Sequence, residues 1–310
     1  EHIWRASQMD NHFLHHPVTQ LLIAGDMSYA DSDPLRWPSF FALHEPLFRS
    51  TLLHVAAGNH EIECNTKSLN VFVPYENYFR VPNRLGQAVT EPITDDYRKT
   101  LWDHSCSAPS SFRAKYDYGN SFYSYKHGLA RIIVLGSYAD TEVGSVQYQF
   151  LQAELEKANR EREQIPWLLV SFHSPLYTTF AGHLNESQSL RMKEAMEPLF
   201  LLHKVNLIVS GHDHGYMRTH PIFDGQVMPT GRAPIYLTLG AGGNREQHSR
   251  FHDPDEAEPW VVKRDISDYG YGHLHMPNAT HARFTWVRDG TSDMGVHDYV
   301  WLQNQFMTID

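Results

Sequence analysis

Short apolar runs that end abruptly in polar residues recur along this chain of 310 residues. Four of these runs have the length of buried β-strands and are bounded by glycine or proline, at residues 21–24, 52–57, 167–172 and 205–210. Amphipathic stretches with apolar residues at helical spacing lie at 145–163 and 187–203. Strands that alternate with helices in this way predict an α/β domain.

A polar residue that can bind a metal follows each of these four runs. Asp26 and Asn59 come after the first two, and His173 and His212 come after the last two. In open α/β sheets the ligand site lies beyond the carboxyl ends of the strands. The sequence therefore predicts that these four side chains gather at one edge of the sheet.

The alternation of predicted strands and helices is interrupted by one segment, and it gives way to β-like segments in the last part of the chain. Residues 62–120 contain several prolines and aromatic residues but no sustained period, and we interpret them as an insertion rather than a second domain. Beyond Tyr216 the chain has β-like segments at 234–239, 283–287 and 299–302. We therefore expect one catalytic domain over residues 1–310, with a distinct C-terminal region at about 230–310.

Composition and charge narrow the class of protein. Apolar residues make up 41% of the chain and charged residues 20%, and no apolar run approaches the roughly 18 to 20 residues that cross a bilayer. We therefore expect a soluble globular protein without a membrane partner. The formal net charge of -10 argues against nucleic acid as a partner, because such binding draws on clustered Lys and Arg. In an acidic compartment the 21 histidines would favour anions, although most can equally be surface residues without a role.

The chain has two cysteines and two sequons for N-glycosylation. Neither Cys64 nor Cys106 lies in a CxxC or nucleophile motif, so redox chemistry is not expected. The sequons place N-glycans at Asn185 and Asn278, which together with a cysteine pair is typical of a secreted protein. We expect a disulfide between Cys64 and Cys106, with two unpaired cysteines as the alternative. The expected location is secreted or a vacuolar, lysosome-like compartment.

Two short motifs place metal-binding side chains next to a glycine. In GDMSYA, Asp26 and Tyr29 stand in a turn after a strand, so that a carboxylate and a phenol can reach one ion. The alternative is a helix-capping Asp beside a packed Tyr. In GNHE, the amide oxygen of Asn59 is followed by His60, which is unusual for packing alone. A polar turn with Asn in a left-handed conformation is the alternative here.

The motif GHDHG at 211–215 is more specific. His212 and His214 are one residue apart and flanked by glycines, and such a pair can serve two neighbouring ions. Two unrelated polar histidines are the alternative. His173 is the first residue after a predicted buried strand, and by itself it would carry no information.

Taken together, these motifs resemble a known family. The blocks GDMSYAD, GNHEIE, SFHSPLY and GHDHGYMR, in this order and spacing, are similar to those of the purple acid phosphatases of the metallophosphoesterase superfamily, especially the large plant-type enzymes. The segment NATHARF at 278–284 resembles the carboxy-terminal region of that family. The resemblance implies a β-sandwich flanked by helices (αββα), with the metal site at the carboxyl ends of the strands.

The resemblance also implies a dinuclear centre of Fe(III) and a divalent ion, which would be Zn, Mn or Fe. Asp26 would bridge the two ions. The remaining ligands that it implies are Tyr29 and His214 for the ferric ion, and Asn59, His173 and His212 for the divalent ion.

The activity that the resemblance implies is hydrolysis of phosphate monoesters at acidic pH, with a metal-bound hydroxide as the nucleophile. His60 and His183 would face the substrate, stabilise transition-state charge and protonate the leaving group. Gly182 stands where such families often carry a second His, which could alter substrate preference, and Met217 stands where Glu is usual. The expected partners are small phosphorylated substrates, with a homodimer as a further option.

One motif of the family is absent before Asp26. The Asp-x-Gly motif supplies a carboxylate to the ferric site in the family, and Asp10, the only earlier aspartate, follows no apolar strand. The chain begins at Glu1 without an initiator Met, so we expect this motif and its strand just upstream in the natural protein. Two alternatives stay open: a non-catalytic binding protein with this fold, and a specialist such as a phytase, pyrophosphatase or phosphodiesterase.

Overall fold

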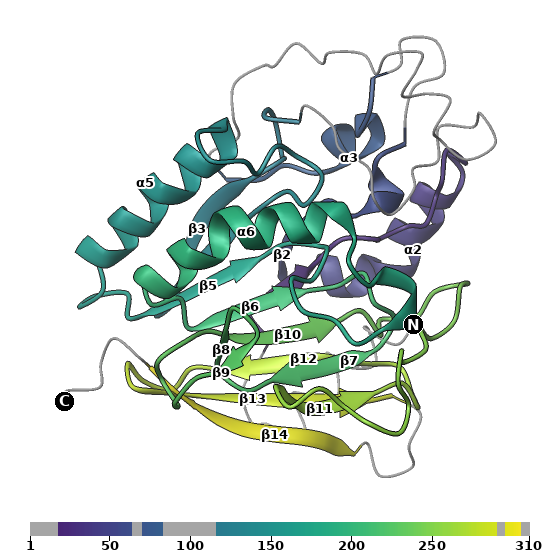
Figure 1. The fold of residues 1–310 in the computed structure, drawn as a ribbon. Helices are drawn as coiled ribbons and strands as arrows, with labels where there is room; N and C mark the ends of the chain where they lie inside the picture. Colours follow the sequence, from purple (N-terminus) through teal and green to yellow (C-terminus); the bar gives the residue numbers. More distant parts are fainter. Residues whose placement is uncertain (1–17, 64–69, 83–115, 290–294, 305–310) are drawn as a thin grey trace.

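The computed structural model describes residues 18–63, 70–82, 116–289 and 295–304. Its largest element is a seven-stranded mixed sheet in the order β11-β7-β10-β6-β5-β4-β3 (Figure 1). Strands β4, β5, β6 and β10 run parallel, and antiparallel strands flank them on both sides. The strands are β3 Tyr123–His127, β4 Ala130–Val134, β5 Trp167–Ser171, β6 Leu207–Ser210, β7 Tyr216–Thr219, β10 Ile235–Leu239 and β11 Val261–Asp265.

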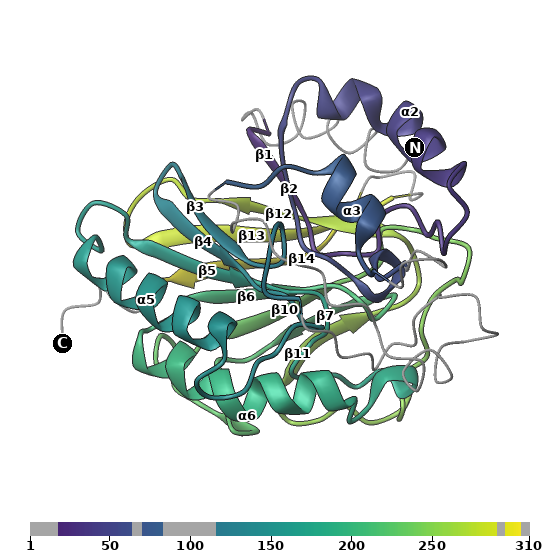
Figure 2. The same ribbon diagram turned by 90° about the horizontal axis from the view of Figure 1, so that it is seen from above.

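Alternation along the parallel strands explains the two faces of this sheet. In β5, Leu168 and Val170 pack against two helices, whereas Trp167 and Leu169 face the opposite side. The two helices are α5 Val146–Arg160 and α6 Ser187–Leu202, and they cover one face of the sheet (Figure 2). The Ser145 hydroxyl accepts a hydrogen bond from the Tyr148 amide and caps the start of α5.

A second β-layer covers the other face. The antiparallel sheet β12-β13-β14 contributes Phe284 and Trp286 to the core that also holds Trp167 and Leu169. The Trp286 ring stacks on that of Tyr216, with 4.6 Å between centroids. The elements are β12 Gly270–His275, β13 His281–Arg288 and β14 Val296–Gln303, and a small hairpin is formed by β8 Ile222–Phe223 and β9 Gln226–Val227.

The parallel pair β1 Gln20–Ile23 and β2 Leu52–Val55 lies beside this second layer. Its partly buried Leu22 packs into the core between the sheets. On the side away from that core, Val55 packs with Trp37 and Tyr75 of the helices α2 Arg36–Phe48 and α3 Val73–Tyr78 (Figure 2). Helices thus lie outside the seven-stranded sheet and outside the β1-β2 pair, and the predicted β-sandwich flanked by helices is confirmed.

The predicted strands and helices agree with the structure to within a few residues. All four apolar runs with a polar end are strands, and both amphipathic stretches are helices. Of the predicted insertion, α3 and the segment around Tyr116 pack into the core beside β2. Cys64, Cys106 and Asp10 lie outside the described residues. Within the part of the chain that the structure describes, no helix is long and apolar enough to span a membrane.

Candidate metal centre

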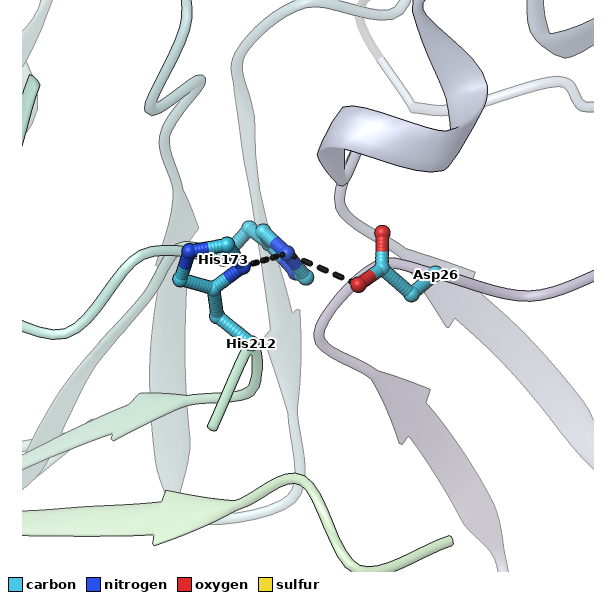
Figure 3. Close-up of side chains that lie close together, drawn as sticks. All are labelled: Asp26, His173 and His212. Atoms are coloured by element: carbon cyan, nitrogen blue, oxygen red, sulfur yellow. Dashed lines mark hydrogen bonds and ion pairs between the residues drawn. The ribbon is translucent and has the colours of Figure 1, made fainter. Parts of the chain in front are cut away.

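The loops after β1, β2, β5 and β6 bring the predicted ligands together at the carboxyl ends of these strands. His173 Nε2 lies 3.1 Å from Asp26 Oδ2, 3.1 Å from Asn59 Oδ1 and 3.0 Å from His212 Nδ1. Figure 3 shows the rings of His173 and His212 side by side, with the carboxylate of Asp26 facing them from the loop after β1. The Gly211 amide donates to the His173 carbonyl at 2.9 Å, which joins the loops after β5 and β6.

Hydrogen bonds on the far side of each ring decide where the histidines carry their protons. His173 Nδ1 lies 2.6 Å from the Ala24 carbonyl, and His214 Nδ1 lies 2.9 Å from the Gln247 carbonyl. A carbonyl only accepts, so these nitrogens hold the protons. His212 donates from Nε2 to Glu186 Oε2 at 2.8 Å. The remaining nitrogen of each ring therefore points a lone pair into the site.

This donor set fits a metal. The lone pairs of His173 Nε2 and His212 Nδ1 face each other at 3.0 Å, beside the oxygens of Asp26 and Asn59. Such an arrangement is repulsive unless a cation or a proton sits among the acceptors. A proton on His173 Nε2 is one such group: burial opposes ionisation of Asp26, but the charge and hydrogen bond of a protonated His173 outweigh burial and hold the pKa of the Asp26 carboxyl well below the ordinary range. One carboxylate, one amide oxygen and two imidazoles are donors suited to a divalent transition metal.

A second group of ligand types lies next to the first. Tyr29 Oη is 3.0 Å from His214 Nε2, and Asn244 donates to the same phenol oxygen at 2.8 Å. Burial, followed by the negative charges of Asp26 and Glu246, raises the pKa of the Tyr29 phenol far above its ordinary range. A phenolate would therefore form only beside a strongly charged cation.

Glu61 ties the two ligand loops of the first half together. It is fully buried, and its carboxylate accepts hydrogen bonds from the backbone amides of Asp26, Met27 and Gly58, each at 2.8 Å. Burial and then the charge of Asp26 raise the pKa of Glu61 to about 7. Sequence reasoning gave Glu61 no role, although it is the fourth residue of the GNHE motif.

His60 lies over the phenol of Tyr29, with 4.1 Å between ring centroids. Its Nδ1 is 2.6 Å from Asp31 Oδ1, and its Nε2 is 3.7 Å from Glu246 Oε1. Burial would lower the pKa of His60, but the charge of Asp26 and the bond to Asp31 outweigh burial and raise it to about 9. His60 thus lies at the rim of the site as a cation.

His183 lies on the opposite rim. Its ring stacks on that of His212, with 3.8 Å between centroids. Burial lowers its pKa, and the hydrogen bond to Asp213 more than offsets this, so the net shift is upward. Asp31, Asp213, Glu186 and Asn244 contact site residues but were not predicted; the first two lie inside the quoted motifs, which is the signal that could have found them.

Two family models match the chain. Calcineurin-like phosphoesterase matches residues 4–216, and iron/zinc purple acid phosphatase-like protein C matches residues 233–299. The chain therefore belongs to the calcineurin-like phosphoesterase family. Within this family it is related to the purple acid phosphatases of plants, which confirms the resemblance drawn from the motifs.

Purple acid phosphatase 18 of Arabidopsis thaliana is 34% identical over 283 residues, covering 91% of this chain and 56% of the relative. Fe(3+)-Zn(2+) purple acid phosphatase 12 of the same plant is 30% identical over 92% of this chain and 57% of its own length. The chain thus spans a little over half the length of these relatives. A purple acid phosphatase from yellow lupin (Lupinus luteus) seeds shares the fold, with a TM-score of 0.72, 22% identity and coverage of 96% of this chain and 48% of that one.

Proposed function

We propose that this chain is the catalytic region of an acid phosphatase that hydrolyses phosphate monoesters at a dinuclear centre of Fe(III) and a divalent ion, Zn, Mn or Fe. The observation that carries the proposal is the convergence of three histidine lone pairs with Asp26 and Asn59, each ring fixed by a hydrogen bond on its far side. The name of the Arabidopsis relative, which states Fe(3+) and Zn(2+), supports this choice of ions.

The residues would divide between two ions. Asp26 Oδ2 faces His173 at 3.1 Å, and Asp26 Oδ1 accepts a hydrogen bond at 3.1 Å from the backbone amide of His60, whose ring lies over that of Tyr29. When bound, the ions would polarise the phosphate and supply a nucleophile derived from water. The ligands in this assignment are Asp26 as the bridge, Tyr29 and His214 for Fe(III), and Asn59, His173 and His212 for the divalent ion.

His60 and His183 would complete the reaction from the rims. The Nδ1 atoms of both rings bond to carboxylates, and His60 Nε2, at 3.7 Å from Glu246 Oε1, is beyond hydrogen-bond distance of that carboxylate, so we assign the Nε2 atoms to contact with a substrate. The raised pKa values of both rings keep them protonated in acid. They would stabilise charge that develops on the phosphate and deliver a proton to the leaving alkoxide, work typically worth about 100- to 10,000-fold.

The remaining proposals concern glycosylation, cellular location, substrates and assembly. Asn185 and Asn278 are both exposed, as acceptors of N-glycans must be, which supports glycosylation at both positions, and we propose a secreted or vacuolar location. Small phosphorylated molecules are the substrates that we propose. A homodimer and the disulfide between Cys64 and Cys106 stay predictions.

Metal analysis combined with a phosphatase assay at pH 5 tests the proposal. His212→Ala and Asn59→Ala should lower divalent-metal content and activity together, whereas His60→Ala should lower turnover with the metals retained. Loss of both metals in His60→Ala would move His60 into the ligand set. A purified protein that binds no metal and hydrolyses no phosphate ester would refute the assignment and favour a binding protein with this fold.

A further inference from the structure

The carboxylate of Asp213 is buried in the middle of the HDH motif, between two proposed ligands. Its Oδ1 accepts a hydrogen bond from His183 Nδ1 at 2.8 Å, and its Oδ2 accepts one from the Thr178 hydroxyl at 2.6 Å. The Thr178 oxygen accepts in turn from the Phe180 amide at 3.0 Å. Within the described part of the chain, His183 is the one cationic group in salt-bridge contact with this carboxylate.

The surroundings of Asp213 hold it in a fixed position behind the His183 ring. Asp213 is 0% exposed, and its carbonyl accepts from the Gly215 amide at 2.7 Å. A Cβ atom on Gly240 would lie only 1.9 Å from the same carbonyl, so the main chain of a neighbouring loop packs directly against it. The carboxylate therefore has little freedom to follow a moving partner.

His183, in contrast, comes from a short segment that is anchored through its backbone, where the Ala181 amide donates to the Arg250 carbonyl at 2.8 Å. It ends the short helix η2 Ala181–His183, which contains no buried residue. Its neighbour Gly182 has no atom within 4 Å of the position of a Cβ. The orientation of the His183 ring therefore depends on two contacts, the hydrogen bond to Asp213 and the stack on His212. The first of these also keeps a proton on Nδ1 and leaves Nε2 outside that hydrogen bond.

We propose that Asp213, held by Thr178, is a positioning residue that sets the tautomer and orientation of His183 for proton donation to the leaving group. This inference rests on the proposed phosphatase function. Loss of a carboxylate that orients a metal-ligating imidazole typically costs about 10- to 100-fold in affinity or activity, and we expect the same range where the imidazole is a proton donor. Replacing Asp213 should therefore lower the rate more for a leaving group that departs only when protonated than for one that departs as an anion.

Two substrates separate this role from a structural one. 4-Nitrophenolate leaves without protonation, whereas the alkoxide of an alkyl phosphate such as glycerol phosphate does not. Asp213→Val should lower kcat for the alkyl phosphate by about 10- to 100-fold and for 4-nitrophenyl phosphate by a factor about tenfold smaller, because the second substrate needs the charge of His183 but no proton from it. KM, metal content and visible absorption should stay close to the wild-type values, because the ligands keep their own hydrogen bonds.

A double-mutant cycle makes the test specific. If Asp213 acts through His183, adding Asp213→Val to His183→Ala should cause no further loss of kcat for the alkyl phosphate. Glu154→Gln is the matched control: its carboxylate binds the buried Arg131 at 2.7 Å, at the amino end of β4 and thus at the far end of the sheet. Glu154→Gln should change thermal stability without changing the ratio of the kcat values for the two substrates.

Thr178→Val and Thr178→Ser test the positioning role of Asp213 if Asp213→Val does not fold. The valine should lower the alkyl phosphate rate severalfold more than the nitrophenyl rate, and the serine should restore it, because only the serine keeps the hydroxyl. Equal losses for both substrates, or a full further loss in the His183→Ala background, would overturn the inference. A wild-type protein inactive on both substrates would instead refute the proposed function itself.

Discussion

Gly58→Ala tests how tightly the bridging carboxylate is held. Gly58 precedes Asn59 and has φ of -94° and ψ of -178°, so an alanine is not strained by its own dihedral angles. A Cβ atom there would lie 2.1 Å from Asp26 Oδ1 and 2.5 Å from the Asp26 backbone nitrogen. The contact with Asp26 therefore decides the outcome.

The expected losses of rate and stability in Gly58→Ala follow from these distances. Real Cβ atoms do not approach other heavy atoms below 3.0 Å, so the carboxylate must move by about 0.9 Å. Because the backbone nitrogen is also too close, rotation of the Asp26 side chain alone cannot relieve the clash. A misplacement of about 1 Å at a reacting centre costs on the order of 100-fold in rate, and overpacking costs about 1 to 3 kcal/mol in stability.

The measurements are metal content, kcat at pH 5 and the midpoint of thermal unfolding for the purified variant. Gly242→Ala is the matched control, because a Cβ there has no atom within 4 Å. We expect Gly58→Ala to lose metal and about 100-fold in kcat, while the control keeps both. A Gly58→Ala protein with two bound metals and kcat within about threefold of wild type would show that the site is not built this tightly.

Three further outcomes are expected. Tyr29→Phe should abolish the violet charge-transfer absorption that a phenolate bound to Fe(III) gives, and a coloured variant would remove Tyr29 from the ligand set. Burial, followed by the charge of His127, lowers the pKa of His54 to about 4; its ring stacks on Tyr125 at 3.5 Å between centroids. Because the folded state holds His54 neutral, stability should fall by about 1 to 2 kcal/mol as the pH drops from about 6.5 to 4, after discounting for its partial exposure. His54→Gln should flatten that decline in urea unfolding curves, and an unchanged slope would contradict the assignment. Non-reducing peptide mapping should recover Cys64 and Cys106 in one crosslinked fragment, whereas two labelled thiols per denatured chain would exclude the bridge.

The position of the ligands along the chain was predictable because strand ends are local features. An apolar run as short as 21–24 or 205–210 that ends at a glycine is more readily interpreted as a strand than as a helix, and the polar residue that follows such a strand lies at the sheet edge. Parallel pairing of β1 with β2, and of β5 with β6, then aligns those ends. For this reason periodicity and a short motif were sufficient to group Asp26, Asn59, His173 and His212.

The supporting contacts were not predictable, because they join segments that are distant in sequence and are set only by packing between the layers. Gln247 accepts from His214 across 33 positions, and Asp213 accepts from His183 across 30. No local pattern indicates which carboxylate will lie behind which ring. The sequence by itself determined the class of fold and the types of ligand. The tertiary structure alone decided the direction of each histidine lone pair, since the hydrogen-bond partner that fixes a tautomer comes from another loop.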